Sequence, residues 1–294
     1  MAQKTENRIK KSGLGAAASR RISNAIVYIA LIAITLIWLF PFFGLVMESF
    51  KVNTRAMDGE LFPEVWGLDN YIRLFKETDF LKWFKNTAIM GVATAVLQTF
   101  FVLSMSYTLS RLRFSGRKFL MNFMLILGMF PGFLTMILIY KVFSDLGLTM
   151  EMAPVGLIIV YCASSGMGYY VSKGFFDTIP KTLDEAARVD GATRAQVFYK
   201  VIMPLSGSIV IYTILMAFMG PWGDYVFASY VAFGHKASYN VAVGLYRWVN
   251  TNDYQGYFTR FCAGGVLVAI PITVLFMCLQ KYYVEGVTGG AVKG

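Results

Sequence analysis

Six stretches of this 294-residue sequence contain no Asp, Glu, Lys, Arg or His and are long enough to cross a lipid bilayer. A membrane-spanning helix needs about 20 consecutive apolar residues. The six runs have 20 to 24 residues each, and they occupy positions 26–47, 87–110, 119–140, 152–172, 201–223 and 261–280. Each run is apolar around its whole circumference, unlike the one-sided helix of a soluble protein. The sequence therefore predicts an all-α polytopic membrane protein with six transmembrane helices.

Composition excludes several other classes of protein. Hydrophobic residues make up 56% of the chain and charged residues 15%, against about 25% charged residues in a typical globular protein. The net charge of +10 does not indicate a nucleic-acid partner, because Lys and Arg cluster between the apolar runs. The three cysteines, Cys162, Cys262 and Cys278, lie inside apolar runs, so they support neither a disulfide framework nor a zinc site.

The distribution of Lys and Arg predicts the orientation of the chain in the membrane. The N-terminal tail, the second-to-third and fourth-to-fifth connections and the C-terminal tail together hold 17 basic residues, and the alternate connections hold 10. Basic residues accumulate on the cytoplasmic side, so both termini are expected in the cytoplasm. A cleavable signal peptide is not expected, because the first apolar run is too long and no A-x-A-like site follows it.

We expect four parts along the chain. Residues 1–25 form a cytoplasmic N-terminal tail, and 26–85 contain the first transmembrane helix and an external loop. Residues 86–283 form the core with five transmembrane helices, and 284–294 form a cytoplasmic C-terminal tail. None of the six runs carries an ionisable side chain, whereas ion-coupled carriers keep one at membrane depth. The same absence argues against an intramembrane enzyme, so no catalytic or metal-binding residue is assigned.

The longest connection on the cytoplasmic side, within 177–204, has the pattern of two short helices. Thr182-Leu-Asp-Glu185 and Thr193-Arg-Ala-Gln196 both match a capping box. Gly191 stands between them and is suited to a turn with positive φ. We expect short helices at 183–190 and 193–200, hinged at Gly191 and with Glu185 at the third position of the first. An ordinary interfacial helix pair fits the local pattern equally well.

A family resemblance appears in this connection. Glu185-Ala186-Ala187, then three residues to Gly191, and nine more to Val201-x-Met203-Pro204, resembles the EAA loop of ATP-binding-cassette importer permeases, with Val201 and Met203 in place of Ile and Leu. Residues 217–225, 241–245 and 286–294 resemble the smaller membrane subunit of maltose and maltodextrin importers. The resemblance implies that the ATPase-coupling residues are Glu185, Ala186, Ala187, Asp190, Gly191 and Pro204.

The resemblance implies a type I importer in a bacterial-type inner membrane. Its expected partners are a second permease subunit, two ATPase subunits, an extracellular sugar-binding protein and the lipid bilayer. The chain itself has no G-x4-G-K-[ST] phosphate loop and no Gly-Lys dipeptide, so it lacks the elements that cradle ATP phosphates. No cofactor is therefore expected on this chain, and ATP and magnesium belong to the ATPase subunits. The expected solute is a malto-oligosaccharide. The alternative solutes are another plant-derived oligosaccharide, an amino acid or a metal ion. The alternative class of protein is an ion-coupled carrier.

The external segment 222–260 combines aromatic and amide side chains suited to recognition. By resemblance, we expect it to contact the binding protein through Tyr246, Arg247, Trp248, Asn250 and Asn252. The fifth run should end or bend near Pro221. The candidates for the pathway or its gate are Pro221, Trp222 and Asp224. An aromatic belt at the membrane surface and an ordinary helix end are the alternatives. The C-terminal tail either frays or docks between the ATPases.

Overall fold

The structure is a computed structural model and describes residues 2–52, 60–163, 166–250 and 254–291. Most of these residues form helices. Within these ranges the one pairing of extended backbone is an isolated bridge between Lys51 and Trp66. The longest helices are α1 (Ala2–Ser49), α3 (Phe80–Arg111) and α14 (Tyr254–Ala291). The predicted all-α class is therefore confirmed.

Among the described residues, three of the predicted spans are continuous helices and three are pairs of helices that meet at a bend. Long apolar segments of α1, α3 and α14 can each cross a membrane alone. The other three predicted spans appear as pairs of shorter helices. These are α4 (Arg117–Gly128) with α5 (Gly132–Asp145), α6 (Ala153–Ala163) with α7 (Gly166–Thr178), and the segment 194–205 with α11 (Gly207–Gly223). The count of six spans holds among the described residues only if each bent pair is one span.

The sharpest break has a local cause. The axes of α4 and α5 differ in direction by 100°, at the one proline of the third predicted span, Pro131. Proline has no amide hydrogen and disfavours helical backbone at the residue before it, so α4 ends and α5 starts again at Gly132. Pro221 sits inside the last turn of α11, which ends at Gly223 as expected.

The remaining elements are short. They are α2 (Asp69–Glu77), a 3-10 turn at Met150–Met152, α8 (Thr182–Val189), α9 (Arg194–Gln196), a π-helical segment at Val197–Ile202, α10 (Met203–Leu205), α12 (Val226–Ala232), a 3-10 turn at Lys236–Ser238 and α13 (Val241–Val249). The predicted external segment 222–260 thus contains α12, the second 3-10 turn, α13 and the start of α14. The predicted tails also contain helix, since α1 begins at Ala2 and α14 continues to Ala291.

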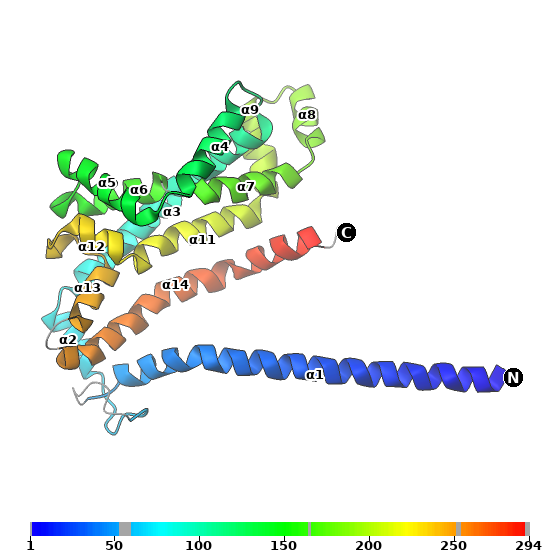
Figure 1. Ribbon diagram of the computed structural model, residues 1–294, viewed down its shortest axis with the longest axis horizontal. Helices are drawn as coiled ribbons and strands as arrows, with labels where there is room; N and C mark the ends of the chain where they lie inside the picture. Colours follow the sequence, from blue (N-terminus) through cyan, green and yellow to red (C-terminus); the bar gives the residue numbers. More distant parts are fainter. Residues whose placement is uncertain (1, 53–59, 164–165, 251–253, 292–294) are drawn as a thin grey trace.

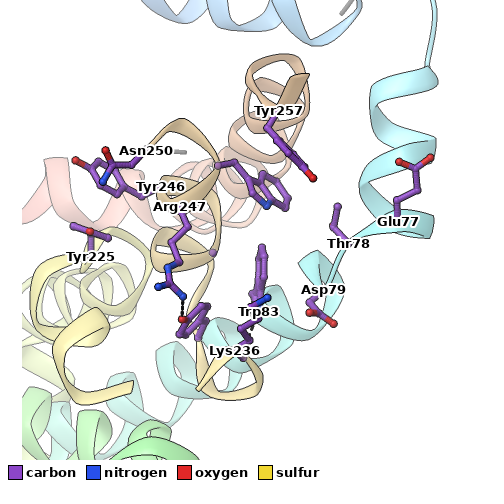
Figure 2. Close-up of a pocket in the computed structure, with 13 residues that line it drawn as sticks. Glu77, Thr78, Asp79, Trp83, Tyr225, Lys236, Tyr246, Arg247, Asn250 and Tyr257 are labelled. Atoms are coloured by element: carbon purple, nitrogen blue, oxygen red, sulfur yellow. Dashed lines mark hydrogen bonds between the residues drawn. The ribbon is translucent and has the colours of Figure 1, made fainter. Parts of the chain in front are cut away.

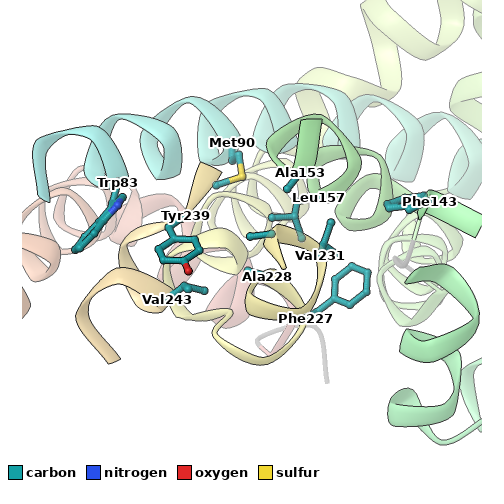
Figure 3. Packing of buried hydrophobic residues seen from close by; sticks show 11 residues of the cluster. Trp83, Met90, Phe143, Ala153, Leu157, Phe227, Ala228, Val231, Tyr239 and Val243 are labelled. Carbon is teal, nitrogen blue, oxygen red and sulfur yellow. The ribbon is translucent and has the colours of Figure 1, made fainter. Parts of the chain in front are cut away.

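Helix α3 is the centre of the packing, with α6, α7, α11 and α13 against it. Figure 3 shows the cluster that joins it to α12 and α13, where Trp83 and Met90 face Tyr239, Val231 and Val243. Helix α1 packs mainly against α14, and its apolar side chains between Ile26 and Phe42 remain exposed. An apolar surface of this kind suits lipid or another membrane helix.

Figure 1 shows how the ends of the helices are distributed. The N-terminal end of α1, the C-terminal end of α14 and α8 all lie towards the right of the view, and α2, α12 and α13 lie towards the left. The EAA-like segment, within 177–204, therefore shares one side of the molecule with the start of α1 and the end of α14. The helices α12 and α13 of the predicted external segment 222–260 lie on the opposite side.

Candidate functional site

The first part of the EAA-like segment is a two-turn helix that begins one residue earlier than expected. Lys181, not Thr182, is the N-cap of α8, and no side chain caps it. The Glu185 amide donates to the Lys181 carbonyl at 3.1 Å, which makes Glu185 the fourth helical residue. The expected capping box at Thr182 is therefore wrong. Glu185 and Ala186 are exposed, whereas Ala187 packs against the core under α8.

The turn after α8 follows the expectation for Gly191. Its φ is +86°, in the left-handed region that favours glycine. The Gly191 amide donates to the Arg188 carbonyl at 3.1 Å, and the Ala192 amide donates to the Ala187 carbonyl at 3.0 Å. This pair of hydrogen bonds is a Schellman motif, with Asp190 as the C-cap. The turn fixes the direction in which the chain leaves α8.

The second capping box is confirmed. The Gln196 amide donates to Thr193 Oγ1 at 3.3 Å, and the Thr193 amide donates to Gln196 Oε1 at 2.8 Å. The helix that starts here continues through the π-helical segment to Leu205, so it is longer than the expected 193–200. Pro204 lies in the first turn of α10, exposed, just before the bend of 86° into α11. The motif residues therefore run from an exposed helix into a membrane span.

A cavity of about 830 Å³ opens on the opposite side of the molecule, and four of the five residues expected to contact a binding protein line it. They are Tyr246, Arg247, Trp248 and Asn250, on or directly after α13. Figure 2 shows Tyr246 and Arg247 on one wall and Glu77, Thr78 and Asp79 across from them. Asn252 lies outside the described residues.

The side chains of this cavity differ in how freely they are presented. Tyr246 is 44% exposed, and Arg247 and Asn250 are also exposed. Trp248 is half-buried, with its ring centroid 5.4 Å from Trp83 and 6.0 Å from Tyr257. The Arg247 guanidinium donates a hydrogen bond to the Tyr239 hydroxyl and lies 5.1 Å above that ring. Arg247 is therefore held in place at the rim. Trp248 packs against neighbouring rings and also lines the cavity.

The sequence reasoning missed the part of the cavity wall that comes from other helices. Glu77, Asp79 and Trp83 come from α2 and the start of α3, and Tyr257 comes from α14. Glu77, Asp79 and Trp83 are far from α13 in sequence, and the tertiary contacts of α3 with α13 bring them to it, whereas Tyr257 lies inside the predicted external segment 222–260. The pattern of a single segment contains no signal for the first three.

The three pathway candidates lie deeper than the cavity rim. Pro221 is buried, and Trp222 is 4% exposed and packs against Phe84 and Phe218. Asp224 accepts a hydrogen bond from the Tyr161 hydroxyl at 2.6 Å and another from the Phe227 amide at 3.0 Å. Asp224 also lines a second cavity, of about 530 Å³, together with residues of α4, α5 and α6.

Comparison with known proteins connects these features. Residues 103–289 match the family model described as "Binding-protein-dependent transport system inner membrane component". The maltodextrin transport system permease protein MdxG of Bacillus subtilis is 33% identical over 96% of this chain and all of its own length. The maltodextrin transport system permease protein MalD of Streptococcus pneumoniae is 34% identical over 94% of this chain and 97% of its own.

The fold has a counterpart among solved structures. A chain of a bacterial ABC transporter involved in the import of the acidic polysaccharide alginate superimposes with a TM-score of 0.73, at 23% identity, over 90% of this chain and 98% of that one. The matched family model runs from within α3 to near the end of α14, and it therefore includes the EAA-like turn, α11 and the cavity wall on α13. This chain accordingly belongs to the family of binding-protein-dependent transport system inner membrane components.

Proposed function

We propose that this chain is one of two permease subunits of an ATP-driven importer of malto-oligosaccharides. The observation that carries the proposal is the likeness, over nearly the whole chain, to two maltodextrin permeases. The alternation of charge-free spans with charged connections agrees with a passive pathway that is driven from outside the chain. Another oligosaccharide is the closest alternative, since the binding protein selects the solute.

In this proposal, α8 and its Schellman turn form the contact with an ATPase subunit. Leu183 and Val189 are 40% and 87% exposed, so α8 presents apolar surface, together with the acidic Glu185 and Asp190, to a partner. Exposed apolar side chains rimmed by charge are typical of a protein interface. Two ATPase subunits would bind ATP and magnesium, and each would hold one such helix from one permease.

A reconstituted complex tests the solute and the energy source. We expect vesicles that contain this chain, its partner permease and the ATPase to take up labelled maltotriose only with ATP and a binding protein. Dissipating proton and sodium gradients should leave uptake unchanged, and this chain alone should hydrolyse no ATP. Gradient-driven uptake without ATP would show an ion-coupled carrier. ATP-driven uptake of another sugar in preference to maltotriose would reject the proposed solute.

We also propose that the cavity face around α13 is extracellular and receives the binding protein, with α8 and both termini in the cytoplasm. The excess of basic residues in the connections on the α8 side supports this orientation. The exposed Tyr246, Arg247 and Asn250 at the cavity rim offer an aromatic ring, a cation and an amide to a partner surface. Such side chains are common in protein interfaces.

Cysteine labelling tests orientation and contact together. In a Cys278→Ser background, Asn250→Cys should react with a membrane-impermeant maleimide in intact cells, and Val189→Cys should react only after the membrane is opened. Sugar-loaded binding protein should slow the labelling of Asn250→Cys several-fold but leave a Lys82→Cys control, which is exposed at the same end and outside the cavity, unchanged. Labelling of Val189→Cys in intact cells would reverse the orientation, and unprotected Asn250→Cys would remove the contact.

A further inference from the structure

A buried ion pair connects the central membrane helix to the exposed α8. Arg111 is the last residue of α3, and its Nε lies 3.0 Å from Asp184 Oδ2 on α8. The Arg111 side chain is 4% exposed and that of Asp184 is 15% exposed. Arg111 Nη2 also donates to the carbonyl of Ile179, just before α8, at 2.8 Å. One guanidinium therefore holds both the start and the first turn of α8.

The surroundings make this pair dependent on both partners. Burial raises the pKa of Asp184 above its ordinary value, the Arg111 guanidinium opposes that shift, and the nearby charge of Glu185 adds to it. The Nε and Nη1 of Arg111 and the Oδ1 of Asp184 are buried and have no hydrogen-bond partner among the described residues, so the contact of Nε with Asp184 Oδ2 is an ion pair without a hydrogen bond. Removing one member of such a pair leaves an uncompensated buried charge, whereas replacing both with apolar residues is often neutral for stability.

A second connection ties the same end of α3 to the helix before α8. Ser110 Oγ donates to Asp177 Oδ1 at 2.6 Å, and Lys173 Nζ lies 2.5 Å from Asp177 Oδ2. The two residues at the end of α3 thus hold the segment that enters α8 and α8 itself. Leu183 and Val189 are 40% and 87% exposed, so α8 also has apolar surface that the described residues leave open.

We propose that Arg111 is a positioning residue that makes α8 and α3 move as one body, so that displacement of α8 by an ATPase reaches the middle of the membrane domain. The inference rests on the proposed function for the driving subunit but not on the identity of the solute. If no contact joined α8 to the end of α3, α8 could follow the ATPase while α3 stayed in place. The ion pair, the Ile179 hydrogen bond and the Ser110–Asp177 bond together oppose that separation.

The experiment measures rigid-body movement directly in the assembled complex. Spin labels are placed at Thr182→Cys on α8 and Lys82→Cys at the far end of α3, both of which are exposed, in the Cys278→Ser background. We expect ATP with vanadate to leave the label distance unchanged in the otherwise native chain and to change it in Arg111→Met. Binding-protein-stimulated uptake per ATP hydrolysed should fall about tenfold in Arg111→Met, with the ATPase still attached. Arg113→Met, an exposed neighbour, should behave as native.

A double variant separates positioning from a purely structural role. Arg111→Met with Asp184→Leu should recover the thermal stability lost in either single variant, because no buried charge is left alone, but it should not recover coupled uptake. Recovery of both would show that the pair only stabilises the fold and would overturn the inference, as would an unchanged label distance in Arg111→Met. If the native complex keeps its label distance but does not transport maltotriose, the proposed solute fails, and the comparison of label distances with Arg111→Met still decides the inference. A label distance that changes in the native complex would overturn the inference.

Discussion

Replacing Gly191 with Val is expected to abolish transport by the assembled complex while the chain still inserts and binds its partner permease. Gly191 has a φ of +86°, a conformation that costs an L-residue about 1–2 kcal/mol and a β-branched residue more. A Cβ at this position meets nothing within 4 Å, so the cost comes from the backbone and not from a clash. The turn is expected to relieve it by changing the exit direction of α8, which misplaces a helix that has to fit a partner.

Asparagine at the same position is the matched control, because it adopts the left-handed conformation far more readily than valine. We expect Gly191→Asn to retain most transport and Gly191→Val to lose it together with ATPase attachment. The measurements are labelled maltotriose uptake and co-purification of all subunits from detergent. Full transport by Gly191→Val would show that the turn is a simple connector.

Replacing Gly244 with Ala is expected to destabilise the chain strongly. A Cβ on Gly244 would overlap the indole ring of Trp83. Trp83 is 5% exposed, its Nε1 donates to the Lys236 carbonyl at 3.1 Å, and its ring packs against Tyr239 and Trp248. The ring cannot move without breaking these contacts, and overpacking of this kind costs about 1–3 kcal/mol.

Thermal unfolding of the purified complex in detergent measures this effect. We expect a clearly lower midpoint for Gly244→Ala, together with altered reactivity of a cysteine at Asn250, because α13 carries one wall of the cavity. Gly174→Ala in α7 is the control, since a Cβ there meets nothing within 4 Å and alanine favours helix. Equal midpoints for the two variants would contradict the packing argument.

Hydropathy predicted which parts of the chain enter the membrane but not how three of those parts bend. The run at 119–140 reads as one span because Pro131, with Gly128 and Gly132 beside it, does not lower the apolar character of the run. The bend depends on backbone geometry, to which a count of charges is insensitive. The continuous span in α3 was predictable because α3 contains no proline. The span in α14 is continuous although it contains Pro271, which leaves the helix intact.

The two capping boxes show where local pattern is sufficient and where it fails. Thr193 and Gln196 match their pattern because the chain enters the helix in extended conformation, with ψ of 160° at Thr193. At Thr182 the preceding residues already turn, since the Leu183 amide donates to the Pro180 carbonyl at 3.3 Å. Proline favours the start of a helix, and the helix therefore has Thr182 as its first residue and not as its N-cap. The cavity wall from α2 and α3 was beyond any local pattern.

The break at Pro131 affects how this part of the chain can be solvated in the bilayer. Twelve residues of α4 rise about 18 Å, which is well short of a hydrocarbon core of about 30 Å. At the end of α4 the Met129 and Phe130 amides bond the carbonyls of Leu125, Ile126 and Leu127, but the first amides of α5 have no intrahelical partner, and lipid tails cannot bond them. Gly128, Phe130 and Gly132 line the 530 Å³ cavity beside Asp224. Water in that cavity, or a neighbouring subunit, must then supply the missing hydrogen bonds, so this face of the chain is one that lipid should not cover.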